Sequence, residues 1–347
     1  MYEQFETTVR EMNTEKDLER IRRFLSEEEL ELEKDAEYTI GVFRKKELIG
    51  TGSLSGKVLK SLSVRKDHQG EGITNRIVTE LVNEAFYRGE THLFIYTKPE
   101  YKALFEDVGF YTIAEIKDHV CLMENMKDGI HGYVRELEKK KEEGSIIGSV
   151  VMNCNPFTLG HQYLIETAAK ECDVLHIFLL WEDRSSFPSE VRYELVKKGV
   201  AHLSNVKVHK GKDYVISSAT FPSYFIKGEE NLLRSQTLLD VEIFRKYLAP
   251  ALGIRRRYVG EEPYCEVTNL YNRSMAEELP KAGIEVRVIS RKEWNDVAIS
   301  ASSVRKGLVE GGVEEVRHLV PDSTYEFLLT ERGGEIIEKM RKREGRH

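Results

Sequence analysis

The sequence predicts an α/β protein with two domains, an α+β domain followed by a domain built on a parallel β-sheet. From Ile146 onward, short apolar runs alternate with amphipathic helical patterns, which is typical of a parallel sheet covered by helices on both faces. Residues 1–126 instead contain runs of alternating apolar and polar residues joined by short turns, which is typical of antiparallel strands. Residues 127–132, which contain two glycines, and the following stretch rich in Lys and Glu, residues 133–143, indicate a boundary within residues 127–145.

A chain of 347 residues is long enough for about two domains. We place the first domain at residues 1–126 and the second at residues 146–330. Residues 127–145 are expected to form a solvated linker helix, and residues 331–347 a charged C-terminal helix.

Each domain has its own pattern of elements. In the first domain, the expected helices are residues 17–33, a pattern after Arg76 that runs through 86, and one that ends near 110; the expected strands are residues 38–44, 47–54, 58–64 and 93–97. In the second domain, the expected strands are residues 146–152, 174–181, 257–260 and 285–289, and the expected helices are residues 160–171, 189–202, 234–248, 268–281 and 301–309. Ligands of a parallel sheet bind beyond the carboxyl ends of its strands.

Composition and charge exclude several functions. The chain has 40% hydrophobic residues, 32% charged residues and a net charge of -7. This balance argues against a nucleic-acid partner, because neutralising phosphates requires a basic face. The longest apolar run, Val174–Trp181, is too short to span a bilayer, and the acidic N-terminus is unlike a signal peptide. The four cysteines and ten histidines have no metal-binding spacing, so we expect a reduced, cytoplasmic protein without a membrane partner or a protein-held metal.

A buried strand, a polar turn and a helix N-terminus follow one another between Ile146 and His161. The free N–H groups and the positive dipole end of a helix attract phosphates, and Gly160 permits a close approach of the anion. His161 lies in the first turn of the same helix, where it can contact the phosphate. Asn155 and Phe157 belong to the preceding turn and are candidate contacts to a nucleotide.

A second helix N-terminus of this kind begins at Ser300. Ser300 is a good N-cap, Ser302 and Ser303 supply hydroxyls in the first turn, and Arg305 adds a fixed cation. The alternative for this stretch is an ordinary capped surface helix with a solvated arginine.

Together the two stretches resemble the two signatures of the HIGH-type nucleotidyltransferase superfamily, with Thr158 in place of the first histidine of H-x-G-H. The resemblance implies a Rossmann-like nucleotidyltransferase domain that binds ATP. It also implies that Thr158 and His161 bind the α- and β-phosphates, and that Arg305 and the three serines bind the β- and γ-phosphates.

Two further loops follow strands of the expected parallel sheet. Arg184, in the loop 181–188, and Arg192, on the next helix, are candidate contacts to substrate or phosphate, or else solvated surface arginines. Gly260 begins the loop 260–264 and is a candidate nucleotide contact. The carboxylates that follow it, Glu261 and Glu262, either hold ribose or metal or form a charged turn.

The first domain contains a glycine-rich loop between a strand and a helix. Consecutive backbone N–H groups around Gly70 and Gly72 would hold a pyrophosphate, unless the glycines serve only the turn. The loop resembles that of GNAT acetyltransferases, which holds the pyrophosphate of coenzyme A, and Gln69 fits the pattern. The candidate contacts to a coenzyme-A-like arm are therefore Val64, Gln69, Gly70, Gly72 and Ile73.

Two positions depart from the GNAT pattern. Thr74 stands where Gly or Ala is usual, and Phe105 stands where many GNAT enzymes have a tyrosine that protonates the leaving thiolate. Phenylalanine has no proton to give. We therefore expect a site for a coenzyme-A-like thiol rather than ordinary acetylation of an amine. His68 and His92 are expected to be structural.

Over essentially the whole chain, the sequence resembles the citrate lyase ligase family, and the strings that carry the resemblance are residues 153–161, 182–196, 258–272 and 298–305. The resemblance implies that ATP, with Mg²⁺, activates acetate as acetyl-AMP, and that the acetyl group passes to the thiol of a coenzyme-A-derived prosthetic group. That group belongs to the acyl carrier subunit of citrate lyase, and AMP and diphosphate are released.

Rival interpretations remain open from the sequence. One is an adenylyltransferase that moves AMP onto a phosphate-bearing pantetheine or mononucleotide, in which the first domain has no evident role. Another is a bifunctional protein whose first domain acetylates a protein amine, against which Phe105 argues. A protein that only binds a nucleotide or a thiol, without catalysis, is the least favoured.

The acetate pocket has three candidate lining residues. Trp181, Phe157 or Tyr264 is expected to line a pocket for the methyl group of acetate. The stretch 212–230 is expected to include loops near the active site.

Overall fold

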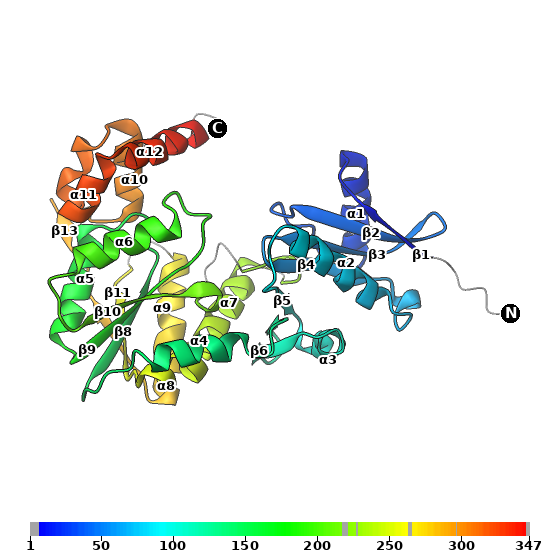
Figure 1. Ribbon diagram of the computed structural model, residues 1–347, viewed down its shortest axis with the longest axis horizontal. Coiled ribbons are helices and arrows are strands. Elements are labelled where there is room, and N and C mark those ends of the chain that lie inside the picture. Colours follow the sequence, from blue (N-terminus) through cyan, green and yellow to red (C-terminus); the bar gives the residue numbers. More distant parts are fainter. Residues whose placement is uncertain (1–6, 217–220, 227, 263–265, 296, 345–347) are drawn as a thin grey trace. The chain divides into compact units, whose positions relative to one another are not determined.

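The computed structural model describes residues 7–216, 221–226, 228–262, 266–295 and 297–344. The chain forms two compact units (Figure 1). The first unit contains Met1–Gly132 and Phe221–Ser235, and the second contains Tyr133–Thr220 and Gln236–His347.

The first unit is built on a seven-stranded sheet with the strand order β1-β2-β3-β4-β5-β7-β6. The strands are β1 Thr7–Glu11, β2 Tyr38–Arg44, β3 Glu47–Ser55, β4 Val58–Val64, β5 Phe94–Thr97, β6 Tyr111–Ile116 and β7 Val120–Glu124. The helices are α1 Glu15–Glu27, α2 Ile73–Tyr87 and α3 Lys102–Glu106. Helix α2 packs Ile77 and Leu81, one turn apart, into the core of the sheet.

Strands β4 and β5 diverge at their carboxyl ends. They are the parallel pair of this sheet, and their ladder consists of Val58 with Phe94 and Leu59 with Ile95. Beyond these pairs, the facing edges of the two strands make no ladder with each other over their described residues. Unpaired backbone amides at such edges can bind an amide-containing chain.

Helix α1 ends earlier than the sequence pattern predicts. The expected helix runs to residue 33, whereas α1 stops at Glu27. Glu29 adopts a left-handed backbone conformation, with φ of 58°. The N–H groups of Glu29 and Leu30 donate to the carbonyls of Ser26 and Leu25, at 3.2 and 2.9 Å. This is a Schellman motif, which closes a helix whatever the periodicity of the residues that follow.

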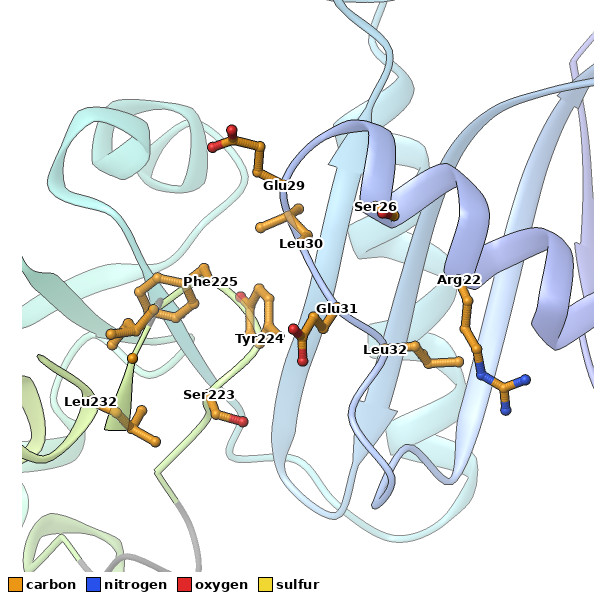
Figure 2. Close-up of a pocket in the computed structure, with 12 residues that line it drawn as sticks. Arg22, Ser26, Glu29, Leu30, Glu31, Leu32, Ser223, Tyr224, Phe225 and Leu232 are labelled. Carbon is orange, nitrogen blue, oxygen red and sulfur yellow. The ribbon is translucent and has the colours of Figure 1, made fainter. Parts of the chain in front are cut away.

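The segment 221–235 packs in the first unit, although the chain on either side of it belongs to the second. Figure 2 shows Ser223, Tyr224 and Phe225 facing the loop that follows α1. The backbone N–H of Glu31 in that loop donates to the carbonyl of Tyr224 at 3.1 Å. The carboxylate of Glu33 accepts from the hydroxyl of Ser223 at 2.9 Å and from the backbone N–H of Tyr224 at 3.2 Å.

The second unit contains a five-stranded sheet in which every adjacent pair is parallel, with the order β10-β9-β8-β11-β12. The strands are β8 Ile147–Met152, β9 Val174–Leu179, β10 Val206–Lys210, β11 Arg256–Gly260 and β12 Glu285–Ile289. The predicted parallel sheet is confirmed. The sequence analysis did not predict β10, a short edge strand whose Val-Lys-Val-His-Lys pattern carries two lysines.

The helices of the second unit cover this sheet and add a C-terminal cluster (Figure 1). They are α5 Leu159–Lys170, α6 Ser189–Gly199, the part of α7 (Glu229–Ile243) from Gln236 onward, α8 Ala249–Leu252, α9 Glu266–Glu278, α10 Ala301–Glu310, α11 Asp322–Leu328 and α12 Glu331–Glu344. A two-stranded sheet, β13 Glu293–Trp294 and β14 Val297–Ala298, precedes α10. Although α12 is strongly charged, it buries Ile336, Ile337 and Met340 in the main core cluster.

Helix α4, Gly129–Glu138, lies within the expected linker but is not simply solvated. Its residues Tyr133 and Leu137 are buried. The hydroxyl of Tyr133 donates to the carbonyl of Lys210 at 2.8 Å, and its ring stacks on that of Tyr214. The residues from Tyr133 onward therefore pack as part of the second unit.

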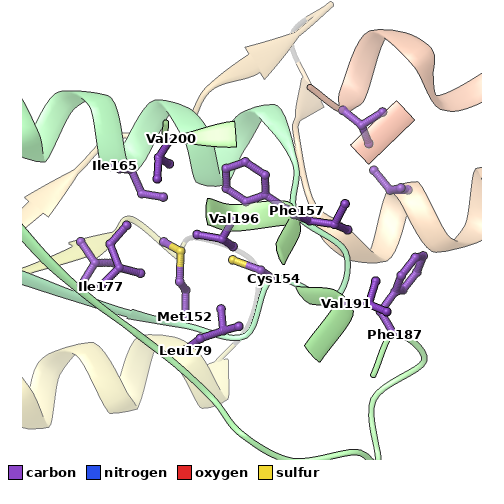
Figure 3. Packing of buried hydrophobic residues seen from close by; sticks show 14 of the residues in the cluster. Met152, Cys154, Phe157, Ile165, Ile177, Leu179, Phe187, Val191, Val196 and Val200 are labelled. Atoms are coloured by element: carbon purple, nitrogen blue, oxygen red, sulfur yellow. The ribbon is translucent and has the colours of Figure 1, made fainter. Parts of the chain in front are cut away.

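The core of the second unit lies directly under the turn that follows β8. Figure 3 shows Met152, Cys154 and Phe157 packed among residues of α5, β9 and α6. A Cβ atom on Gly199 of α6 would lie 2.3 Å from the ring of Phe157, so the helix backbone touches that ring. The turn before α5 is thus fixed from below by close packing.

Two buried histidines on neighbouring strands make the second unit sensitive to acid. Nδ1 of His176 and Nε2 of His209 lie 2.9 Å apart. Among the described residues, the other ring nitrogens, Nε2 of His176 and Nδ1 of His209, have no hydrogen-bond partner. Burial lowers the pKa of His176 to about 4 and that of His209 to about 3. Both rings are neutral in the folded protein at pH 7.

We expect the melting temperature to fall as the pH is lowered from about 6.5, the ordinary pKa of histidine, towards 4. In this window the unfolded chain binds protons that the folded chain does not, so stability present above pH 6.5 is progressively lost. His209→Gln removes one of these groups and should reduce the fall relative to the native chain in parallel melting curves. An equal fall in both proteins would contradict this assignment.

None of the helices in the described ranges is long and apolar enough to cross a membrane.

Candidate active site

The turn between β8 and α5 is held by a reciprocal cap at the helix N-terminus. The hydroxyl of Thr158, the N-cap residue, accepts from the backbone N–H of His161 at 3.3 Å. In return, Nδ1 of His161 accepts from the backbone N–H of Thr158 at 3.1 Å. The two sequence-predicted residues therefore hold each other in place.

This cap assigns the tautomer of His161. Because Nδ1 accepts a hydrogen bond, the proton of the neutral ring is on Nε2, which is a donor. Burial, and then the nearby cation of Arg291, lower the pKa of His161 to about 4, so the ring is neutral at pH 7. Phe157 stacks behind it with an interplanar angle of 15°. A fixed N–H donor is thus available for a phosphate oxygen.

The second predicted motif forms the same kind of helix start. Ser300 caps α10, and its Oγ accepts from the backbone N–H of Ser303 at 3.0 Å. Arg305 connects the two motifs, because its Nη1 donates to the carbonyl of Asn155 at 2.6 Å. Its Nη2 donates to Oγ of Ser302 at 3.2 Å. Arg305 is therefore a cation fixed at the junction of the two helix N-termini.

Gly160 is the point where the two motifs touch. A Cβ atom at this position would lie 2.8 Å from the carbonyl oxygen of Ile299, the residue before the second helix cap. Backbone oxygen cannot yield as a flexible side chain can, so glycine is required here for a reason of packing. The sequence analysis assigned Gly160 to the approach of a phosphate, and the structure adds contact between the motifs.

We expect Gly160→Ala to push the two motifs apart, to destabilise the second unit by about 1–3 kcal/mol and to lower nucleotide-dependent activity at least tenfold. Gly334→Ala is the matched control, because an added Cβ there meets no atom within 4 Å. Urea unfolding and diphosphate–ATP exchange measure the two effects. Wild-type exchange in Gly160→Ala would show that the contact with Ile299 is unimportant.

Both motifs line one cavity of about 730 Å³ in the second unit. Its lining residues are Thr158, Gly160, His161, Leu164, Gly260, Glu262, Ile289, Ser290, Arg291, Lys292, Val297, Ala298, Ile299, Ser300, Ala301, Ser302 and Ser303. The structure thus brings Thr158, Gly160, His161, Gly260 and the three serines together, as the sequence analysis expected of one nucleotide site.

Arg291 and Lys292 are the residues of this cavity that the sequence analysis missed. They follow β12 directly, and the rule that ligands bind at the carboxyl ends of parallel strands could have identified them. Arg291 is ion-paired to Glu262, and its Nε donates to the carbonyl of Glu261 at 2.7 Å. Glu262 is therefore balanced by a cation at the cavity wall.

Arg192 is neither a solvated arginine nor a phosphate ligand. Its side chain is fully buried, and its Nε donates to the carbonyl of Phe187 at 2.9 Å. Its Nη1 donates to the carbonyls of Asn153 and Leu180, at 2.9 and 2.8 Å. Its Nη2 also forms an ion pair with the buried carboxylate of Glu182 at 3.6 Å. Arg192 therefore ties together the loops that follow β8 and β9.

Other candidates take supporting positions or lie elsewhere. Oδ1 of Asn155 accepts from the backbone N–H of Phe187 at 2.9 Å, so Asn155 anchors the loop after β9. Phe157 lies in the core behind His161. Arg184 is exposed, and neither it nor Trp181 is among the residues that line the cavity.

Tyr264 lies outside the described residues, so its expected place near the methyl group of acetate has no structural counterpart. Within the described ranges, no group of three or more His, Cys, Asp or Glu side chains is arranged to hold a metal ion.

The first unit has a cavity of about 500 Å³ at the glycine-rich loop. Gly70 and Gly72 have φ angles of 81° and 78°, a conformation that favours glycine. Gly72 caps α2 without any side-chain hydrogen bond, so the N–H groups of the first helical turn remain available to an anion. All five predicted arm contacts, Val64, Gln69, Gly70, Gly72 and Ile73, line this cavity.

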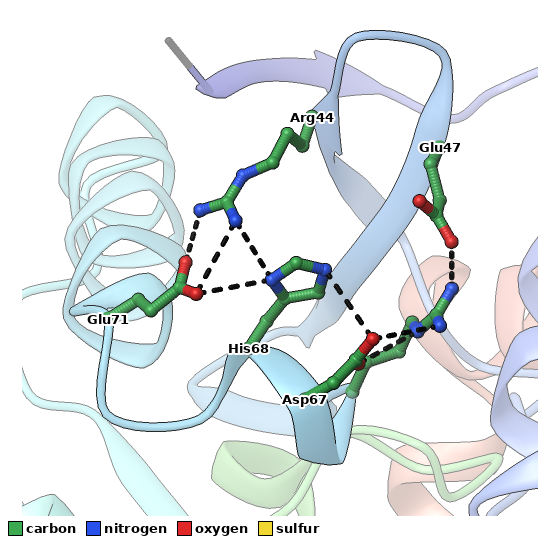
Figure 4. A network of polar contacts seen from close by, with 6 residues as sticks. Arg44, Glu47, Asp67, His68 and Glu71 are labelled. Atoms are coloured by element: carbon green, nitrogen blue, oxygen red, sulfur yellow. Dashed lines mark hydrogen bonds and ion pairs between the residues drawn. The ribbon is translucent and has the colours of Figure 1, made fainter. Parts of the chain in front are cut away.

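A polar network supports the glycine-rich loop from behind (Figure 4). Arg44 is ion-paired to Glu71, and it bonds Nδ1 of His68 at 3.1 Å. Arg65 forms two hydrogen bonds of 3.1 Å with Asp67. His68 is thus part of the scaffold of the loop, as the sequence analysis expected.

Phe105, at the position of the GNAT tyrosine, is buried in the hydrophobic core of the first unit. A different phenol, Tyr101, lines the cavity one turn earlier. Burial and the carboxylate of Glu100 raise the pKa of Tyr101, so it is protonated at pH 7. The sequence analysis missed it because the family pattern directed attention to Phe105.

Comparison with known proteins agrees with this geometry. The family model described as the citrate lyase ligase C-terminal domain matches residues 147–328, and that of the acetyltransferase (GNAT) domain matches residues 9–127. The chain belongs to the citrate lyase ligase family. The [citrate [pro-3S]-lyase] ligase of Escherichia coli is 43% identical over 318 residues, which cover 90% of each chain. That of Haemophilus influenzae is 40% identical over 320 residues, which cover 90% of this chain and 96% of its own.

Membership of the citrate lyase ligase family confirms several predictions. They are the resemblance itself, the GNAT-like first domain followed by a nucleotidyltransferase-like domain, and the class of enzyme, an acid–thiol ligase. A phosphopantetheine adenylyltransferase of Finegoldia magna is 33% identical over 67 residues, 19% of this chain. The similarity to citrate lyase ligases spans far more of the chain, which favours ligation over adenylyl transfer.

Proposed function

We propose that this citrate lyase ligase joins acetate to the thiol of a coenzyme-A-derived arm on the acyl carrier subunit of citrate lyase, at the expense of ATP. The cavity where the two helix N-termini meet is the observation that supports this most strongly. It combines a neutral histidine donor, serine hydroxyls and two cationic side chains, Arg291 and Lys292, and Arg305 bonds Ser302 beside it, a set suited to a triphosphate.

In the second unit, an oxygen of acetate would attack the α-phosphorus of ATP, and the bond to the bridging oxygen of diphosphate would break. Negative charge gathers on the phosphate oxygens as this happens. Nε2–H of His161 and the N–H groups of the first turn of α5 would stabilise that charge. Because His161 is neutral before ATP arrives, its Nδ1 keeps accepting from Thr158 while its Nε2–H is free to donate to the phosphate.

Diphosphate departure would be assisted from the other side of the cavity. Ser300, Ser302 and Ser303 offer hydroxyl and backbone donors, and Arg305 adds a fixed cation at the junction of the motifs. Mg²⁺ would enter as the ATP complex and share the charge of the β- and γ-phosphates. Gly260 would let the nucleotide lie close to the end of β11.

In the first unit, the loop Gln69–Gly72 would hold the diphosphate of the arm at the uncapped N-terminus of α2. The sulfur would then attack the acetyl carbon of acetyl-AMP. A carbon–sulfur bond forms, AMP leaves, and the thiol gives up its proton. This step needs no acid beside the sulfur, so Phe105 is compatible with it.

Acetylation of an amine by the first unit is less well supported. It would need a proton donor to the leaving thiolate, and Phe105, at the position of the GNAT tyrosine, cannot be that donor. We further propose that the enzyme acts in the cytoplasm, where ATP is available, and that neither nucleic acid nor a membrane takes part.

The test is a complete reaction with ATP, Mg²⁺, acetate and the thiol form of citrate lyase. We expect one acetyl group on the carrier subunit, by mass spectrometry, for each AMP and each diphosphate released. Release of ADP, or acetylation from acetyl-CoA without ATP, would rule the proposal out.

A further inference from the structure

A segment from the second half of the chain, residues 221–235, packs as part of the first unit. The sequence analysis assigned no function to the stretch 212–230, yet residues 221–235 pack in the first unit. Two aromatic residues of this segment, Tyr224 and Phe225, line the cavity that contains the glycine-rich loop, and Leu30 lies beside them.

The aromatic pair is firmly held. The hydroxyl of Tyr224 donates to the carbonyl of Tyr96 in β5 at 2.8 Å. Both side chains are buried, and their rings meet edge to face with centroids 4.9 Å apart. The carboxylate of Glu33, itself ion-paired to the buried Lys60 of β4, accepts from the backbone N–H of Tyr224. Hydrogen bonds and packing thus fix Tyr224 and Phe225 in the wall of the cavity.

The position of the pair along the cavity follows from the strands. Tyr224 bonds the backbone of Glu31, whose carbonyl in turn accepts from the hydroxyl of Ser61 at 3.0 Å. Ser61 precedes Val64, where β4 ends and the glycine-rich loop begins, by three residues. Three residues of strand span about 10 Å. Tyr224 and the phosphate-binding glycine-rich loop at Gly70 are therefore at opposite ends of the stretch over which β4 and β5 diverge.

The same aromatic pair also separates two cavities. Leu30, Tyr224 and Phe225 line both the arm cavity and a second cavity of about 870 Å³ in the first unit. Figure 2 shows these three side chains at the edge of the second cavity. The two rings therefore form part of the wall of both cavities.

We propose that Tyr224 and Phe225 are binding residues for the thiol arm, and that they set the depth to which its thiol end enters the first unit. The proposal rests on the function proposed above. With the phosphate at Gly70 and Gly72, the amides of the arm lie between the diverging ends of β4 and β5. The apolar methylene groups next to sulfur then pack against the two rings.

Calorimetric titration of the full-length protein with coenzyme A, standing in for the arm, tests this. We expect Phe225→Ala to weaken binding about tenfold, because an anchoring ring is lost. Tyr224→Phe keeps the ring and removes the bond to Tyr96, so about fivefold is expected. Tyr87→Ala, an exposed tyrosine of the same unit, is the control. Melting curves verify that each variant folds.

Kinetics distinguish a binding role from a structural one. In both variants, KM for the carrier subunit should rise while diphosphate–ATP exchange in the second unit stays at the wild-type rate. If the wild-type protein binds coenzyme A and both variants bind it equally well, the aromatic pair has no such role, and the proposed function stands. If the wild-type protein does not bind coenzyme A, the arm site of the proposed function is wrong, and this inference falls with it.

Discussion

His161→Ala should lower acetate-dependent diphosphate–ATP exchange by about 10²- to 10³-fold, the usual loss when one fixed donor to a developing oxyanion is removed. The backbone N–H of Thr158 fixes the ring through Nδ1, so Nε2–H is already oriented before the nucleotide binds. An alanine leaves the helix dipole but removes this donor. The measurement is the exchange rate at saturating ATP and acetate.

Loss of the cap needs to be separated from loss of the donor. Removing the ring also deprives Thr158 of its acceptor, for which we expect about 1 kcal/mol of lost stability, far too little to unfold the unit. His202→Ala is the matched control, because His202 is exposed and its Nε2 pairs with Glu166 at 3.1 Å, on the surface. Near-normal exchange in a folded His161→Ala protein would show that His161 does not contact the reacting phosphates.

Arg192→Ala should cost about 3–5 kcal/mol of stability, the largest effect we expect from any single substitution on folding. The change leaves the carbonyls of Asn153, Leu180 and Phe187 without their donor and leaves Glu182 as a buried charge without its cation. Urea unfolding, followed by the fluorescence of Trp181 in the same loop, measures the loss.

The neighbouring arginine provides the comparison for this prediction. Arg184 lies in the loop directly before α6, the helix that carries Arg192, but it is exposed, so Arg184→Ala should change stability by less than about 1 kcal/mol. Equal effects of the two substitutions would mean that burial of Arg192 does not organise the loops after β8 and β9. Arg192→Lys should not restore stability, since one ammonium cannot reach all of these acceptors.

The two helix starts were predictable because their signals are local. Thr158 and Ser300 are N-cap residues directly before amphipathic patterns, and both cap their helices in the structure. The alternation of strand and helix likewise gave the parallel sheet. The glycine-rich loop at Gly70 and Gly72 was predictable for the same reason. Glycine favours the left-handed conformation that both residues adopt, so the local sequence is enough to predict a turn before the helix.

The remaining features depend on contacts between distant parts of the chain. Nothing near Arg192 in the sequence shows that three carbonyls from other segments surround it. The edge strand β10 was missed because partial burial leaves only a weak pattern. The packing of Tyr133 was missed because its partners, Lys210 and Tyr214, lie more than 70 residues away. The passage of Tyr224 into the first unit is set by partners such as Glu31 and Tyr96, which are more than 100 residues away.

The central claim is that this chain makes acetyl-AMP from ATP and acetate. The most direct measurement is exchange of labelled diphosphate into ATP, with Mg²⁺ and with or without acetate, in the absence of any carrier protein. We predict exchange that requires acetate. Exchange that ignores acetate but responds to the adenylylated product of a phosphorylated thiol or mononucleotide would contradict the claim, as would the lack of any exchange even after citrate lyase is added.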